Sequence, residues 1–203
     1  MNECLLCETP IAATPSWKAL VALEKQTEIC RDCSKKFQRA DIKEEDPFLD
    51  HITSLYTYNE AMREYLHQFK FLQDVALASI FANELRPYLL KRDAIIVPIP
   101  MHPEKKVQRT FSPVDELLKR ARIPFTHILD KTGTEAMGEK SRTERLAMEP
   151  LFALKPGATV QSGTYIVLDD IYTTGTTLRH AATVLKEAGA RRVEAVTLIR
   201  AER

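Results

Sequence analysis

The sequence predicts an α/β fold, a parallel sheet with helices on both faces, preceded by a small N-terminal ribbon built on cysteines. Short β-branched apolar runs, such as AIIVPI at 94–99 and TYIVLD at 164–169, alternate with segments of helical period. Such alternation is typical of parallel strands joined by right-handed helical crossovers. All four cysteines lie within the first 33 residues. We therefore expect a ribbon at 1–40, a linker at 41–50 and the α/β domain at 51–203.

The composition is that of an ordinary globular protein. The chain has 203 residues, of which 44% are apolar and 28% charged, and a formal net charge of +1. A chain of this length can bury a sizeable core, and its charge gives no strong overall field for nucleic acid. The apolar runs are too short to span a bilayer, and no secretory signal is recognisable. We expect a cytoplasmic protein without membrane insertion.

The cysteines form two CxxC pairs, Cys4 with Cys7 and Cys30 with Cys33. Two such knuckles suit a tetrahedral Zn²⁺ site with four thiolate ligands. The alternatives are two disulfides, which a reducing cytoplasm disfavours, and a redox CxxC, which needs no second copy. Four thiolates leave no position for water, so the zinc is expected to be structural. The charged stretch that follows, broken by Pro47, is the expected linker.

Hydrophobic periodicity gives the elements of the α/β domain in order. Helices are expected from Glu60 to about residue 70 and over 77–89, followed by the strand at 94–99. Ser112 and Pro113 are an N-cap and a first-turn proline, so the next helix begins there. Further strands are expected at 126–129, 164–169 and 193–199, with a helix at 178–188 that Gly189 ends.

The stretch LDDIYTTGTTL at 168–178 carries the strongest functional signal. We expect the strand to end at Asp169 and Asp170, a loop at 171–177, and a helix beginning near Thr176. A loop that leads into a helix N-terminus attracts an anion, and Gly175 allows the backbone to approach it closely. The loop hydroxyls can donate to phosphate oxygens; they belong to Thr173, Thr174, Thr176 and Thr177.

The two aspartates would repel that phosphate, so they must face another part of the ligand. Carboxylates accept hydrogen bonds from paired hydroxyls and bind Mg²⁺. A ligand with a phosphate at one end and a diol at the other is a ribose 5-phosphate. The alternative is that Asp169 and Asp170 merely hydrate a strand end.

A second segment, PIPMHPEKKVQRTF at 98–111, follows the strand at 94–97. Ligands of open parallel sheets bind beyond the carboxyl ends of the strands. The cations of this segment can neutralise a diphosphate; they are His102, Lys105, Lys106 and Arg109. The alternative is a solvated basic loop.

The stretch LDDIYTTGTT resembles the signature with which type I phosphoribosyltransferases bind 5-phosphoribosyl-1-pyrophosphate (PRPP). The cysteine pairs, YLHQFKF at 65–71, IVPIPMHPEKKVQRTF at 96–111 and EAGARRVEAVTLIR at 187–200 extend the resemblance over nearly the whole chain. In this order they are similar to the ComF family, which includes a late competence protein required for natural DNA uptake.

This resemblance implies a type I phosphoribosyltransferase-like fold that binds PRPP with Mg²⁺, with Asp169, Asp170 and Arg109 as the residues of the chemistry. It also implies Lys70 and Arg145 in the same pocket. The implied partners are a ComFA-type helicase and single-stranded DNA.

The chain departs from the family pattern. Thr110, Ser112 and Pro113 stand where the family has Gly, Asn and Gln, and Met137 and Met148 replace later amides. We expect residues 130–150 to form a mobile hood over the site; the alternative is a disordered surface loop. Two hypotheses remain: a PRPP-binding competence protein whose ribbon contacts its partners, or an active phosphoribosyltransferase that acts on an unidentified nitrogenous acceptor. We favour the first, because no site for an acceptor base can be named.

Overall fold

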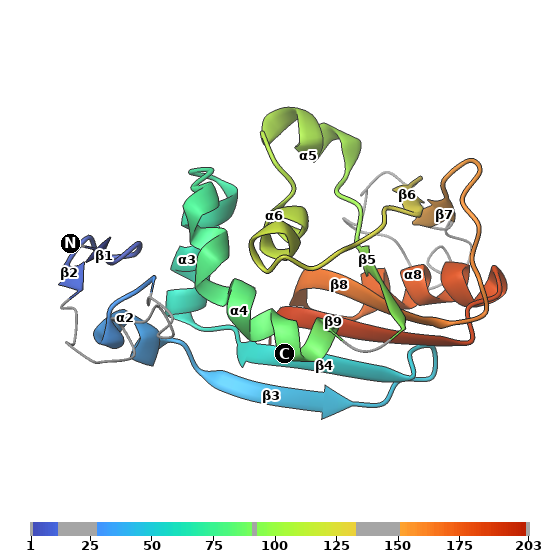
Figure 1. The fold of residues 1–203 in the computed structure, drawn as a ribbon, viewed down its shortest axis with the longest axis horizontal. Coiled ribbons are helices and arrows are strands. Elements are labelled where there is room, and N and C mark those ends of the chain that lie inside the picture. Colours follow the sequence, from blue (N-terminus) through green and yellow to red (C-terminus); the bar gives the residue numbers. More distant parts are fainter. Residues whose placement is uncertain (1, 12–27, 91–92, 133–150, 202–203) are drawn as a thin grey trace, which may run out of the picture.

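The structure is a computed structural model that describes residues 2–11, 28–90, 93–132 and 151–201. Its centre is a five-stranded sheet with the order β3-β4-β9-β8-β5 (Figure 1). The strands are β3 (Arg39–Glu44), β4 (His51–Thr57), β5 (Ala94–Pro98), β8 (Thr164–Tyr172) and β9 (Arg192–Arg200). Every neighbouring pair is parallel except β3 and β4. The predicted α/β fold with a parallel sheet is therefore confirmed.

Helices cover both faces of this sheet. One face carries α3 (Glu60–Lys70), α4 (Ala78–Leu89) and α6 (Pro113–Arg120), and the other carries α8 (Thr176–Glu187). A short 3₁₀ turn, η1 (Val75–Leu77), joins α3 to α4. Side chains of β8 alternate between the two cores, as the two-residue period of a strand requires: Ile166 and Leu168 face one, Tyr165 and Val167 the other.

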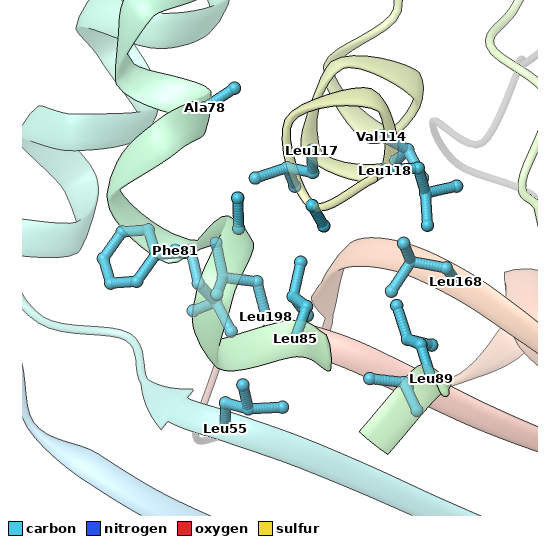
Figure 2. Close-up of a cluster of buried hydrophobic side chains, with 14 of the residues drawn as sticks. Leu55, Ala78, Phe81, Leu85, Leu89, Val114, Leu117, Leu118, Leu168 and Leu198 are labelled. Atoms are coloured by element: carbon cyan, nitrogen blue, oxygen red, sulfur yellow. The ribbon is translucent and has the colours of Figure 1, made fainter. Parts of the chain in front are cut away.

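Figure 2 shows the first of these cores, where Leu85 of α4 and Leu117 of α6 meet Leu168 and Leu198 of the sheet. These side chains are at most 1% exposed. Burying a side chain of this size contributes about 2 kcal/mol, so the helices are held firmly against the strands that carry the candidate site. Among the described residues no helix is both long and apolar enough to cross a membrane.

The predicted helices are confirmed almost residue by residue. The buried face of α3 is Met62, Tyr65, Leu66 and Phe69, the predicted stripe. The Ser112 hydroxyl accepts from the backbone N–H of Asp115 and begins α6. At the end of α8, Gly189 has φ +111° and its N–H donates to the carbonyl of Lys186. Left-handed φ is the conformation that glycine adopts without strain.

The predicted linker at 41–50 overlaps a strand, because residues 39–44 form β3 on the edge of the sheet. Its sequence, RADIKE, alternates exposed and half-buried positions, and only Ala40 and Ile42 are apolar. Charged side chains on an edge strand prevent pairing with other chains. Because charged residues occupy most positions of this strand, the alternation of apolar and polar residues that identifies a strand is weak here.

The strand predicted at 126–129 is misplaced. Thr126 donates one backbone hydrogen bond to Ile96 of β5 (2.9 Å), and the regular strand β6 (Leu129–Lys131) begins three residues later. It pairs antiparallel with β7 (Phe152–Leu154), outside the main sheet. The apolar run indicates an extended chain, but periodicity does not specify the partner of a strand.

The N-terminal segment has strands β1 (Asn2–Glu3) and β2 (Pro10–Ile11), which pair antiparallel, and a helix α2 (Arg31–Lys36). It lies beside α3 in Figure 1. Leu5, Leu6 and Phe37 pack against the core that α3 and α4 form. The Phe37 ring stands edge-on to that of Phe81, with centroids 5.1 Å apart. The described part of the segment is therefore attached to the larger domain by apolar contacts.

Candidate functional site

The threonine-glycine stretch forms a tight turn between β8 and α8. The strand continues two residues beyond the predicted end, because Ile171 and Tyr172 still pair with Ile199 and Arg200 of β9. The expected loop at 171–177 is thereby shortened to residues 173–175, and α8 begins at Thr176 as predicted.

Gly175 is required in this turn for two reasons. Its φ is +77°, and a Cβ placed on it would lie 2.6 Å from the Tyr172 hydroxyl oxygen. The Thr174 and Thr176 hydroxyls share a hydrogen bond of 2.9 Å, while Thr173 and Thr174 are exposed. The predicted phosphate-binding residues, Thr173 to Thr177, thus occupy one turn and the first residues of α8, where unpaired N–H groups favour an anion.

Arg179, which we did not predict as a site residue, holds this turn in place. Its Nη1 donates to the carbonyl of Thr174 (2.9 Å), and its Nε donates to the Asp46 carboxylate (2.8 Å). Burial opposes ionisation of Asp46, but hydrogen bonds from the Phe48 backbone and from Arg179 outweigh it, so the pKa of Asp46 is lowered. The segment expected as a linker therefore supports the turn. In the sequence, the signal that could have indicated this role of Arg179 was a single arginine in the first turn of the helix that follows the loop.

The acid pair lies inside β8, and Ile171 and Tyr172 separate it from this turn. Asp170 is 9% exposed and forms an ion pair with Lys70 at the end of α3. The Asp169 carboxylate accepts from the backbone N–H of Asp170 (2.8 Å). Burial, followed by the negative charge of Asp170, raises the pKa of Asp169 to about 7. Lys70, which the resemblance assigned to this pocket, is thus in direct contact with one of the predicted acids.

The basic segment leaves β5 at the same edge of the sheet. Since β5 and β8 are parallel neighbours, their carboxyl ends lie together. The segment contains a short helix, α5 (Pro103–Gln108), which projects away from the sheet (Figure 1). Lys105 and Lys106 are exposed on this helix.

The two ends of α5 carry the remaining predicted cations. His102 is its N-cap, because the imidazole Nδ1 accepts from the backbone N–H of Glu104 (3.3 Å). The Arg109 guanidinium lies over the Phe71 ring, 5.3 Å from its centroid. His102 therefore has a structural role in this conformation, and pyrophosphate binding by these residues stays a prediction.

A groove of about 440 Å³ runs along α8 beside the turn, and Phe48, Arg179 and His180 are among the residues that line it. Burial lowers the pKa of His180. Asp169 and Asp170 do not line this groove, so it is distinct from the acid pair.

The cysteines come together as predicted. The four sulfur atoms of Cys4, Cys7, Cys30 and Cys33 lie within 4.8 Å of one another. The Sγ atoms of Cys7 and Cys30 are 3.7 Å apart, close to the ~3.8 Å edge of a tetrahedron with Zn–S bonds of about 2.3 Å. Hydrogen bonds with Thr9 lower the pKa of Cys7 to about 6, which favours a thiolate. The donor set therefore fits zinc.

Several predicted features lie outside the described residues. Arg145, Met137 and Met148 belong to residues 133–150, as does most of the expected hood. Of the predicted site residues, the structure groups the acid pair, the threonine turn and Lys70, and it places the basic segment directly after the neighbouring strand β5.

Gly175→Ala is expected to destabilise the fold more than Gly157→Ala. Both glycines have positive φ, +77° and +79°, but a Cβ has nothing within 4 Å at Gly157. Urea titration should give a loss of about 1 kcal/mol at Gly157 from left-handed strain alone, and about 2–3 kcal/mol at Gly175, where Tyr172 must also move. Equal losses would contradict a role for Tyr172 in shaping the turn.

Comparison with known proteins agrees with these features. The family described as "Phosphoribosyl transferase domain" matches residues 107–203. A solved hypoxanthine phosphoribosyltransferase of Staphylococcus aureus is 17% identical, with 64% of this chain and 62% of its own covered. The TM-score of this comparison is 0.38.

Curated relatives match over nearly the full length. Competence protein ComFC of Streptococcus pneumoniae is 29% identical, covering 98% of this chain and 100% of its own. Competence protein ComFC of Bacillus subtilis is 30% identical, covering 97% and 94%. The chain therefore belongs to the ComFC family of competence proteins, and it carries a phosphoribosyltransferase domain.

Proposed function

We propose that this protein acts in natural transformation and that its phosphoribosyltransferase domain binds PRPP with Mg²⁺. The observation that carries the proposal is the arrangement at one sheet edge. The half-buried Asp169 and the buried Asp170 lie near the end of β8, a threonine-glycine turn follows that strand, and a basic segment leaves the parallel strand β5 beside it. Each group matches a different part of a phosphoribosyl ligand.

The turn supports binding of the 5-phosphate, because Gly175 lets the backbone approach and the N-terminus of α8 favours an anion. Asp169 and Asp170 then accept from the ribose hydroxyls. Lys105, Lys106 and Arg109, with His102 beside them, are assigned to the pyrophosphate. Mg²⁺, when bound, would neutralise charge on that pyrophosphate.

The four-cysteine site is assigned to one structural zinc ion. All four ligand positions would be filled by thiolate, so the ion takes no part in chemistry. The ion would stabilise the fold of the short segment that contains β1, β2 and α2, because this segment has little hydrophobic core of its own.

We further assign the ribbon as the surface that contacts partners, a ComFA-type helicase and single-stranded DNA, in the cytoplasm. A rigid metal-bound platform beside α3 supplies such a surface without adding chemistry. Cys30→Ser should then weaken both contacts in pull-down and DNA-binding assays. Unchanged binding by a variant that has lost its zinc would contradict this assignment.

Zinc content tests the metal site directly. Mass spectrometry of metals in the purified chain should give one zinc per molecule, and Cys30→Ser should lower it well below one. Chelation should melt the N-terminal segment while the α/β domain keeps its far-ultraviolet signal, because the two cores of that domain contain no cysteine. A metal-free wild-type protein with four titratable thiols would contradict the assignment.

PRPP binding is expected to depend on the acid pair. Calorimetric titration of PRPP with Mg²⁺ should show binding to the wild type that Asp169→Asn/Asp170→Asn loses, because amides do not accept from the diol as strongly. Asp93→Asn is a matched control, since Asp93 is exposed just before β5, at the opposite edge of the sheet. It should bind like the wild type.

A folded, zinc-loaded wild-type protein that did not bind PRPP would contradict the proposal. Pyrophosphate release from PRPP with a panel of nitrogenous bases separates binding from transfer. Magnesium-dependent release that Asp170→Asn abolishes would favour the alternative of an active phosphoribosyltransferase.

A further inference from the structure

We propose that the end of α3, residues 70–74, is a positioning element that sets the placement of the basic segment relative to the acid pair. This inference rests on the proposed PRPP site and identifies what holds its two halves together. The three positioning residues are Lys70, Phe71 and Gln73. They come from an element that precedes both site strands in the sequence.

Lys70 ties the α3 end to the acid pair. Its ion pair with Asp170 has little solvent around it, because the two side chains are only 14% and 13% exposed. Removing one partner of such a pair leaves the other charge buried and uncompensated. The backbone of the α3 end is therefore anchored to β8.

Gln73 ties the same end to the basic segment. Its Oε1 accepts from the Thr110 hydroxyl (2.7 Å) and more weakly from the Thr110 N–H (3.4 Å). Its Nε2 donates to the carbonyl of Gln108 (3.4 Å). These contacts fix the chain on either side of Arg109.

The backbone of Gln73 supports the same conclusion. Its φ is +58°, the left-handed region that a residue with a Cβ rarely adopts. Such a conformation persists where surrounding contacts determine it. Backbone hydrogen bonds from Leu72 to His67 and from Asp74 to Gln68 close the turn from within. The described contacts of the Gln73 side chain all go to Gln108 and Thr110, so they connect this strained turn to the basic segment.

Phe71 provides the surface on which Arg109 lies. The guanidinium is 5.3 Å from the centre of the Phe71 ring, a cation–π distance. On α3 itself, His67 stacks with the same ring, with centroids 5.6 Å apart. Phe71 is 65% exposed, and this exposure is expected of a ring that orients a side chain at the mouth of a site and does not pack in the core.

The contacts form a continuous path from Asp170 through Lys70, the α3 end and Gln73 to Thr110 and Arg109. A ligand that touches only the acid pair and the threonine turn does not need the far end of this path. A ligand that also carries a pyrophosphate depends on the whole path. The residues that bind its ribose and 5-phosphate must lie at a fixed distance from the residues that bind its pyrophosphate.

Gln73→Gly tests the inference, because glycine adopts a φ of +58° without strain while losing all three side-chain contacts. Calorimetry with the full chain should show PRPP with Mg²⁺ bound about tenfold more weakly, close to the effect of one lost hydrogen bond. Ribose 5-phosphate should bind as it does to the wild type. The unfolding midpoint should not fall.

Two variants complete the experiment. Arg122→Gly is the matched control, because Arg122 is also left-handed (φ +53°) and exposed, and it follows α6; it should bind both ligands normally. Lys70→Met should weaken both ligands, since it removes the partner of Asp170.

The inference is overturned if Gln73→Gly binds PRPP like the wild type, or if it loses both ligands equally. In either case the proposed function stands as long as the wild type binds PRPP. A wild-type protein that binds neither ligand would overturn the proposed function, and this inference with it.

Discussion

The parallel pairing of β5 with β8 and of β8 with β9 is the constraint on which the rest of the structure depends. Parallel strands end at the same edge, so the pairing brings together two segments that lie about seventy residues apart in the sequence. The helices on both faces bury the strands and fix their register, because a shift of one residue would exchange the two cores. The position of the acid pair follows from this register.

The same edge must accommodate charge that the interior disfavours. Asp170 is buried, and Asp169 beside it has a raised pKa because of burial and of its neighbour's charge. Lys70 compensates Asp170 from α3, and Arg179 compensates Asp46 beneath the turn. Both cations come from helices, whereas Asp170 lies on β8 and Asp46 lies between β3 and β4. The site is therefore assembled by tertiary packing around a short local motif.

What could be predicted from the sequence was mostly local. The helical stripe of α3, the Ser112 cap and the Gly175 turn depend on neighbours within a few residues, and each was predicted correctly. The metal cluster was predictable because the spacing within each CxxC pair is itself local.

The features that were missed depend on distant partners. The edge strand β3 is defined by pairing with β4, and the end of β8 by pairing with β9. The contacts of Arg179 with Asp46 and of Gln73 with Thr110 join segments that no periodicity connects. Lys70 was suggested by family resemblance alone, and only the fold identifies Asp170 as its partner.

A crystal structure of the protein with ribose 5-phosphate would test most directly whether one sheet edge forms the ligand site. We predict the phosphate at the turn of residues 173–177, against the N-terminus of α8, and the ribose hydroxyls on Asp169 and Asp170. This account would be contradicted by a phosphate bound on Lys105 and Lys106 instead, with Asp170 still paired only with Lys70 and no ribose hydroxyl on either aspartate.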